Sequence, residues 1–398
     1  MNNPSSRLDV VDCLRGFAIV SIMLLHNIEH FDLYFKPPGL PAWMVAVDQV
    51  IWDSLFFLFG GKSYAIFSLL FGVTFFIQLN NRAQRGEDFR PRFAWRLLLL
   101  ALFGLVNSMF YQGDILMMYA VFGLVLLPVA RMPTKAVFAI ACVLMLQPVE
   151  WANVVGALDN PAAKLPNPAS WAYFAQTETY LKADSMWTTW MGNLTTGKMA
   201  AWRWSWENGR FFQIMSLFML GMLAGRKALF AATDAARRFW TRTLVAAATC
   251  FVPLYLSKSN MATLVPGEAL RRPLETIIGS WSNLAFMLVL VSGFVLLFRF
   301  NGAQRLFKLF GPLGRMSLTS YISQSLIGTA LYHGYGLAFY KTTSASMSLA
   351  IGLVLALLQG AFSAWWLRHH AQGPLEALWH RATWWRHRPA NPAVASAV

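Results

Sequence analysis

Long apolar stretches recur along the whole chain, and they constrain its fold more than any other feature. Each is near the length that a helix needs to cross a bilayer. A chain that is 57% hydrophobic and only 13% charged is also far from the balance of an ordinary soluble domain. We therefore expect an all-α, polytopic membrane protein in which residues 1–398 form one integral membrane domain. The ten expected spanning helices cover 10–29, 62–80, 95–111, 113–130, 135–151, 210–226, 241–257, 277–299, 312–333 and 346–367.

The basic residues predict which ends of these helices face the cytoplasm. With the N-terminus inside, most of the 33 arginines and lysines fall in cytoplasmic connections, as the positive-inside rule requires. Segment 44–59 differs from the other apolar stretches, because Asp48 and Asp53 interrupt its apolar run. Counting it as a full span would put the arginine-rich loop 82–96 outside, so we expect an interfacial or re-entrant helix there. Both termini, including a tail at 384–398, are then cytoplasmic.

Segment 152–209 is the one long connection, and this topology places it on the outer side. Its stretch "SMWTTWMGNLTTGKMAAWRWSWENGR" interleaves tryptophans with polar residues. Such a pattern suits a lid over a binding site, and it equally suits an aromatic belt at the lipid headgroups. The sequence leaves these two alternatives open.

The net charge of +15 is explained by the membrane rather than by nucleic acid, because the basic residues border apolar spans. We expect the lipid bilayer as a partner and no nucleic acid, and we leave the oligomeric state open. The cysteines Cys13, Cys142 and Cys250 show neither CxxC nor Cys/His spacing. The sequence therefore predicts no disulfide framework and no zinc site.

The first apolar segment, "VVDCLRGFAIVSIMLLHNIEHF", carries polar residues that are costly in hydrocarbon. On a helix, Asp12, Arg15 and His26 share one face, with Ile19 and Ile22 between them. Asp12 and Arg15 are three residues apart and can form a local ion pair, which would be a purely structural role. His26 lies about 21 Å from Asp12 along the helix axis, so it belongs to the outer end of the same polar face.

Other polar residues are expected near the level of His26. Lys62 opens the second span, and Asp114 begins the fourth, with Tyr119 further along it. Asp114 has a structural alternative, because an aspartate at a helix start caps free backbone N–H groups. The pair His26 and His30 is the only metal-like spacing in the chain, and we predict no metal site.

The block 314–325 is too polar for a helix that faces lipid, so it must face protein or water. We expect it to share the ion pair of Asp12 and Arg15. Together with residues from the other spans it completes the set of candidate donor- or substrate-binding residues. These are Asp12, Arg15, Lys62, Arg96, Asn107, Tyr119, Arg315, Ser317 and Gln324.

Five blocks carry a resemblance to a known family. They are "RLDVVDCLRGFAIVSIMLLHNI", "GKSYAIFSLLFGVTFF", "GDILMMYAVFGLVLL", "GRMSLTSYISQSLIGTALYHGYGL" and "GPLEALWHRAT", and they extend over nearly the whole chain. Together they resemble the YeiB-like family of bacterial multi-pass membrane proteins, whose function is unknown. The first block is also similar to the opening helix of the heparan-α-glucosaminide N-acetyltransferase group and of bacterial membrane O-acyltransferases. The resemblance implies a location in the bacterial cytoplasmic (inner) membrane.

The resemblance also implies roles for particular residues. The first-helix Asp and Arg-Gly of these relatives match Asp12, Arg15 and Gly16. In the O-acyltransferases a functional His follows the Arg by eleven positions, which is the spacing of His26. Many YeiB-like members have Asn there instead, and Asn27 looks like that Asn displaced by one position. Asn107 stands where relatives often have a His, so this chain lacks that residue as a base.

Two functions from different classes follow. The first is acyl transfer from a cytoplasmic thioester such as acyl-CoA (acetyl-CoA) to a hydroxyl or amine of an envelope glycan or lipid. In it His26 is the general base, Asn27 or Asp114 orients the acceptor, and Arg15 with Arg96 holds the donor phosphates. The second is a transporter or lipid-handling protein without chemistry, in which the same polar groups line a path. Neither function requires a covalently bound cofactor, and acetyl-CoA enters only as a co-substrate.

Overall fold

The computed structural model describes residues 8–385, and within that range the chain is helical and contains no strand. This confirms the expected all-α fold. The expected tail at 384–398 lies almost entirely outside the described residues. The longer helices are α1 (Asp9–Ile28), α2 (Ala42–Phe59), α3 (Ser63–Ala83), α4 (Arg90–Phe110), α12 (Arg210–Arg226), α13 (Asp234–Ser259), α15 (Glu268–Leu297), α18 (Ser317–Tyr332) and α19 (Ala345–His369).

Shorter helices connect and cover these. They are α5 (Leu116–Gly123), α6 (Leu126–Val129), α7 (Thr134–Met145), α8 (Pro148–Gly156), α9 (Ala169–Leu181), α10 (Met186–Gly192), α11 (Lys198–Glu207), α14 (Met261–Leu264), α16 (Asn301–Phe307), α17 (Gly311–Arg315) and α20 (Pro374–Trp384). A π-helical turn, η1 (Asn193–Gly197), joins α10 to α11, and two 3-10 turns are η2 (Lys308–Phe310) and η3 (Phe339–Lys341).

Six helical segments of the described chain are long and apolar enough to cross a membrane. A seventh is obtained if α7 and α8, which are bent by 43° at their junction, form one broken span. The protein is thus a multi-helix membrane protein, but the predicted count of ten spans is not confirmed. The remaining expected spans are helical yet short: α12 has 17 residues, α18 has 16, and the fourth expected span is divided into α5 and α6.

Segment 44–59 lies in the helix α2, and Gly60 and Gly61 separate this helix from α3. Gly61 has a φ of +75°, a conformation that glycine adopts without steric cost. Across this short break α2 and α3 make one apolar run of 42 residues. Of the α2 side chains, only that of Leu55 is buried. Whether α2 lies at the interface or enters the bilayer stays a prediction.

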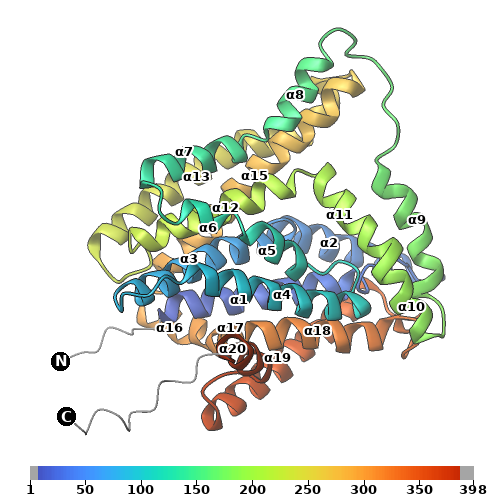
Figure 1. Ribbon diagram of the computed structural model, residues 1–398. Coiled ribbons are helices and arrows are strands. Elements are labelled where there is room, and N and C mark those ends of the chain that lie inside the picture. Colours follow the sequence, from blue (N-terminus) through green and yellow to red (C-terminus); the bar gives the residue numbers. More distant parts are fainter. Residues whose placement is uncertain (1–7, 386–398) are drawn as a thin grey trace, which may run out of the picture.

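Helix α1 lies at the centre of the bundle, with 14 of its residues buried, and packs against α2, α3, α17, α18 and α19. In Figure 1, helices α7, α8, α13 and α15 form a separate layer on one side of it. Glycines allow the closest helix contacts. A Cβ atom on Gly314 would lie 1.8 Å from the carbonyl oxygen of Asp12, and one on Gly221 would lie 1.9 Å from that of Leu69. The positions of α17 against α1 and of α12 against α3 therefore depend on glycine.

Segment 152–209 folds into α9, α10, η1 and α11, which cover one end of the bundle (Figure 1). Asn193 ties it to the last turn of α4 by donating from Nδ2 to the carbonyl oxygens of Met109 (3.0 Å) and Phe110 (2.9 Å). The segment is thus built as a cover over this end. Its placement on the outer side of the membrane stays a prediction.

Candidate functional site

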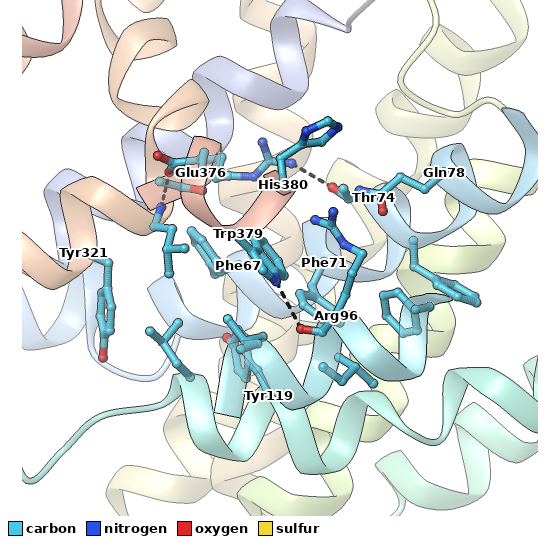
Figure 2. Close-up of a pocket in the computed structure, with 18 of the residues that line it drawn as sticks. Phe67, Phe71, Thr74, Gln78, Arg96, Tyr119, Tyr321, Glu376, Trp379 and His380 are labelled. Atoms are coloured by element: carbon cyan, nitrogen blue, oxygen red, sulfur yellow. Dashed lines mark hydrogen bonds between the residues drawn. The ribbon is translucent and has the colours of Figure 1, made fainter. Parts of the chain in front are cut away.

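A cavity of about 510 Å³ lies between α1, α3, α4, α5, α18 and α20 (Figure 2). One end is basic and the walls are mainly aromatic and aliphatic. On α3 its lining extends from Arg82 to Tyr64, which corresponds to about 27 Å of helix. The cavity is therefore long and narrow, with Gln78 toward one end and Tyr321 at the other in Figure 2.

The basic end of the cavity is its mouth, and it lies where the charge pattern predicts the cytoplasm. Its cationic lining residues are Arg82, Arg85, Arg96 and Arg315. Helix α20 covers this end: the Arg96 guanidinium lies 4.1 Å from the ring centre of Trp379, and that of Arg82 lies 4.2 Å from Trp384. The predicted donor-binding residues Arg96, Arg315 and Ser317 thus line the same cavity.

Helix α20 is held in place by hydrogen bonds to α18. The carboxylate of Glu376 accepts from the backbone N–H groups of Leu318 (2.7 Å) and Thr319 (3.1 Å) at the start of α18. His380 lies beside the mouth arginines, and its pKa is lowered by burial and then by the positive charges of Arg96 and Arg82. An imidazole and several guanidinium groups therefore face the opening.

The expected ion pair on α1 is present. Arg15 donates from Nη1 to Oδ1 of Asp12 (3.0 Å) and to the carbonyl oxygen of Gly314 (3.4 Å), and from Nη2 to the hydroxyl of Thr74 (2.8 Å). The 314–325 block therefore shares this pair, as predicted. Arg15 also lines the cavity, followed along the same helix face by Ile19 and Ile22.

The inner end of the cavity is formed by phenol side chains. Tyr119 donates its O–H to the carbonyl oxygen of Tyr64 (2.7 Å) and accepts from Ser68 (2.8 Å). Tyr321 accepts the backbone N–H of Ile115 at 3.3 Å. The cavity thus ends at the turn between α4 and α5.

Asp114 is buried in the same turn, and its contacts are structural. It accepts from Nδ2 of Asn107 (2.8 Å) and from the backbone N–H of Met117 (3.2 Å), which is the helix-capping role. Its carboxylate also lies 3.7 Å from Nζ of Lys198 in the covering segment. Asp114 and Asn107 are therefore brought together with Lys198 rather than with His26.

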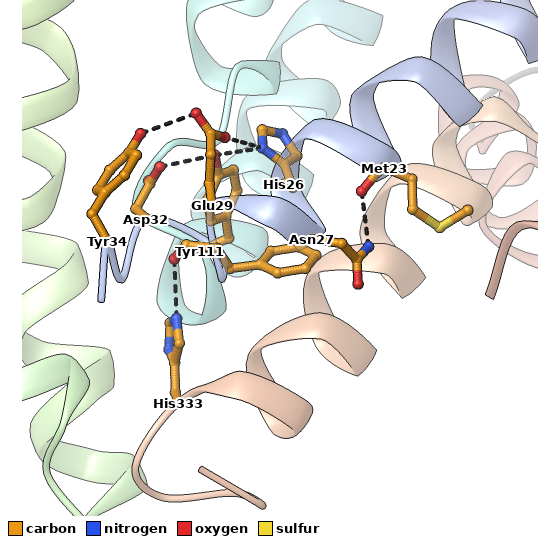
Figure 3. Close-up of polar contacts among 9 residues, drawn as sticks. Met23, His26, Asn27, Glu29, Asp32, Tyr34, Tyr111 and His333 are labelled. Carbon is orange, nitrogen blue, oxygen red and sulfur yellow. Dashed lines mark hydrogen bonds and ion pairs between the residues drawn. The ribbon is translucent and has the colours of Figure 1, made fainter. Parts of the chain in front are cut away.

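His26 belongs to a polar cluster one helical turn beyond Ile22, outside the cavity lining (Figure 3). Its Nδ1 lies 3.3 Å from Oε2 of Glu29 and 3.1 Å from the hydroxyl of Tyr111. Tyr111 also donates to Asp32 (3.4 Å). The His26 side chain is 20% exposed. If Nδ1 donates to Glu29, Nε2 keeps a lone pair that can accept a proton.

The turn that carries this cluster is strained. His30, Phe31 and Asp32 have φ values of 49°, 54° and 69°, so three consecutive residues other than glycine are left-handed. Such residues cost on the order of 1–3 kcal/mol each and persist only where the surroundings fix them. Here the His30 ring bonds Ser348 (2.9 Å) and His333 bonds the Phe31 carbonyl (3.0 Å). Strain of this kind concentrates at functional sites.

Three other predicted residues neither contact the His26 side chain nor line the cavity. Asn27 points to the opposite side of α1 in Figure 3, where it donates to the carbonyl of Met23 (2.8 Å) and accepts from Tyr332 (3.1 Å). Lys62 contacts the carbonyl of Phe56 (3.4 Å) and the ring of Phe286. Gln324 bonds Gln359 on α19 at 2.9 Å. All three make contacts within the helix bundle.

His26 and His30 do not converge on a common point, because each has its own partners. Within residues 8–385 no group of three or more His, Cys, Asp or Glu residues is arranged to hold a metal ion. The residues that sequence reasoning missed are Glu29, Asp32, Tyr111 and Lys198. Glu29 follows His26 by three residues, so helical spacing alone indicated that contact. The contact between Asp32 and Tyr111 depends on the turn after α1. The contact of Lys198 with Asp114 depends on the covering segment 152–209.

The chain is similar to known proteins, but these relatives have no stated activity. The model of a family described as "Protein of unknown function (DUF418)" matches residues 224–386. The uncharacterized protein YeiB of Escherichia coli (strain K12) is 28% identical, over 97% of this chain and 97% of its own. The resemblance to the YeiB-like family is confirmed. The uncharacterized protein YxaH of Bacillus subtilis (strain 168) is 26% identical, over 97% of this chain and 96% of its own. No solved structure matches the chain.

Similarity to these YeiB-like relatives extends well beyond the matched family segment. It includes α1 and the turn after it, and therefore both halves of the candidate site. None of the relatives' names states a substrate or a reaction.

Proposed function

We propose that the protein is an acyltransferase of the bacterial cytoplasmic membrane. It takes an acyl group from a cytoplasmic, phosphate-bearing thioester of the acyl-CoA kind and passes it to a hydroxyl or amine of an envelope glycan or lipid. One observation carries the proposal: a cavity with an arginine mouth follows the polar face of α1 from Arg15 to Ile22, one turn short of His26. Its mouth faces the cytoplasm and the strained turn faces outward.

The mouth suits the anionic end of such a donor. Guanidinium groups bind phosphate oxygens through paired, charge-assisted hydrogen bonds. Arg82, Arg85 and Arg96 supply several of these groups at one opening. The aromatic walls at Phe67 and Phe71 then accommodate a mostly apolar arm that leads the thioester inward.

The chemistry begins at the outer cluster. An acceptor hydroxyl bound near Glu29 and Asp32 gives its proton to Nε2 of His26, while Glu29 holds Nδ1–H and stabilises the imidazolium that forms. The acceptor oxygen bonds to the thioester carbon and the carbonyl electron pair moves to oxygen. Collapse of this intermediate breaks the C–S bond, and the departing thiolate takes the proton back from His26. To reach His26, the donor's acyl end must extend beyond the cavity lining by the one helical turn that separates Ile22 from His26.

The same cavity also supports a second candidate function. Its phenylalanine-rich wall and basic mouth fit a phospholipid, with the phosphate at the arginines and an acyl chain inside. The protein would then handle lipid without covalent chemistry. Only the acyltransferase requires the base at His26.

Label transfer tests the proposal and separates the two candidates. Inverted membrane vesicles that contain the protein are given [¹⁴C]acetyl-CoA, and label is followed into the lipid and glycan fractions. We expect wild-type transfer and a loss of roughly a hundredfold for His26→Gln, which keeps a polar shape without a titratable base. The matched control is His369→Gln, since His369 is exposed on α19 and contacts only its own helix.

Two results would overturn the acyltransferase. One is the absence of transfer by the wild type in vesicles that retain the native envelope lipids. The other is an unimpaired His26→Gln variant. Phospholipid that copurifies in the cavity of a protein without transfer activity favours lipid handling.

A further inference from the structure

The structure assigns a role to Tyr321 that no sequence pattern indicated: its hydroxyl stabilises the oxyanion formed during acyl transfer. This inference rests on the proposed function. Tyr321 projects from α18, is 5% exposed, and lines the inner end of the cavity. The group is therefore placed where the thioester end of a donor would arrive.

The hydroxyl of Tyr321 has a hydrogen-bond donor that the fold does not use. Its oxygen accepts the backbone N–H of Ile115 (3.3 Å), and no acceptor for its own O–H hydrogen is found among residues 8–385. Tyr119 in the same cavity differs, because its hydroxyl donates to the Tyr64 carbonyl and accepts from Ser68. A buried donor left without a partner costs free energy, so it calls for an explanation.

The bond from Ile115 also prepares this donor. A hydroxyl that accepts an N–H is polarised and becomes a stronger donor itself. Because α18 and the α4–α5 turn fix the oxygen, little reorganisation is needed when negative charge appears nearby. Such a hydroxyl bonds the carbonyl oxygen of the bound acyl donor and binds it more strongly as negative charge develops on that oxygen.

The α4–α5 turn links Tyr321 to the outer cluster. Ile115 at one end of this turn donates its backbone N–H to the Tyr321 hydroxyl (3.3 Å), and the hydroxyl of Tyr111 at the other end lies 3.1 Å from Nδ1 of His26. A thioester carbon held between Tyr321 and His26 can be attacked from the His26 side. Its carbonyl oxygen then points toward Tyr321.

The acceptor O–H loses its proton to Nε2 of His26 as the new C–O bond forms. The carbonyl π electrons become a lone pair on oxygen, which receives a hydrogen bond from the Tyr321 O–H without taking its proton. When the C–S bond breaks, the C=O bond re-forms and the hydrogen bond weakens.

Tyr321→Phe tests the inference, because it keeps the ring and removes only the O–H. We expect acetyl-CoA to bind with little change and label transfer to fall by about 100-fold, as on loss of one oxyanion donor. A second readout is the infrared carbonyl stretch of bound [1-¹³C]acetyl-CoA, which should move to higher frequency in the variant. Tyr335→Phe is the matched control, since the Tyr335 hydroxyl donates to Thr329 (2.8 Å) outside the cavity.

An unchanged carbonyl frequency in Tyr321→Phe overturns the inference, whatever the rate, because a merely structural tyrosine would not touch the carbonyl. A transfer rate within twofold of wild type overturns it as well. If the wild type neither binds nor transfers from acetyl-CoA, the proposed function fails instead.

Discussion

At the scale of single residues, the cluster around His26 depends on how three left-handed residues return the chain. His30, Phe31 and Asp32 reverse its direction directly after α1, and this brings the Asp32 carboxylate to Tyr111. Burial, and then the negative charge of Glu29, raises the pKa of Asp32 from 3.8 to about 7. Around neutral pH this carboxyl is therefore poised between its two protonation states.

This shift predicts how stability depends on pH. The folded protein keeps a proton on Asp32 that the unfolded chain releases near pH 3.8, so the stabilising contribution is complete at low pH. It declines as pH rises toward about 7 and is lost above that value. In melting curves of detergent-solubilised protein, Asp32→Asn should remove this decline relative to wild type between pH 5 and pH 7. Parallel wild-type and variant profiles would show that Asp32 ionises normally.

Some of the site follows from single residues in the sequence. The pair of Asp12 and Arg15 was predictable because both partners lie on one helix, three residues apart. The contact of Asp32 with Tyr111 was not, because it requires a turn of non-glycine residues that propensity disfavours. Asn27 was predicted as a site residue from the family resemblance, and Gln324 from the polarity of the 314–325 block. Both are buried and make hydrogen bonds between helices, a role that sequence does not distinguish from function.

At the scale of helices, close backbone contact holds α1 against the elements that form the cavity. Gly16 and Gly314 face each other: a Cβ on Gly16 would lie 1.9 Å from the Phe310 carbonyl oxygen, and one on Gly314 would lie 1.8 Å from that of Asp12. Small residues at such crossings are the usual means of packing helices in membranes. This contact fixes the position of Arg15 beside the 314–325 block.

Gly314→Ala should therefore disrupt the crossing, with a loss of about 1–3 kcal/mol or more from overpacking. The expected result is a lower melting temperature and a smaller monodisperse fraction on size-exclusion chromatography. Gly302→Ala is the control, because a Cβ there meets no atom within 4 Å. Equal behaviour of the two variants would mean that α17 can move away from α1 without cost.

The presence of the helices was predictable from the apolar runs, whereas the number of membrane-spanning helices was not. Every expected span contains helix, but several are too short or too broken to be counted as spans. The reason is physical: nine of the 16 residues of α18 are buried in the bundle, and a helix that is buried in this way need not meet the length that lipid demands. The covering role of helices α9 to α11 was likewise not predictable from the sequence, because an aromatic belt and a cover have the same composition.

At the scale of the whole molecule, the two ends of the bundle differ in chemistry. One end gathers arginines around the mouth of a cavity, with α20 across it. The other carries the strained turn, with the covering segment 152–209 packed at the end of α4. From the arginine mouth, the cavity extends toward the other end only as far as Ile22 and Tyr321. A donor from one side and an acceptor from the other would meet at that boundary.

The most direct test of this account is a structure of the protein in lipid nanodiscs with acetyl-CoA, determined by cryo-electron microscopy. The account predicts ligand density that begins at Arg82 and Arg96, follows α1 past Arg15, and ends at Tyr321. Density elsewhere on the protein, or a cavity filled by lipid at saturating acetyl-CoA, would contradict it.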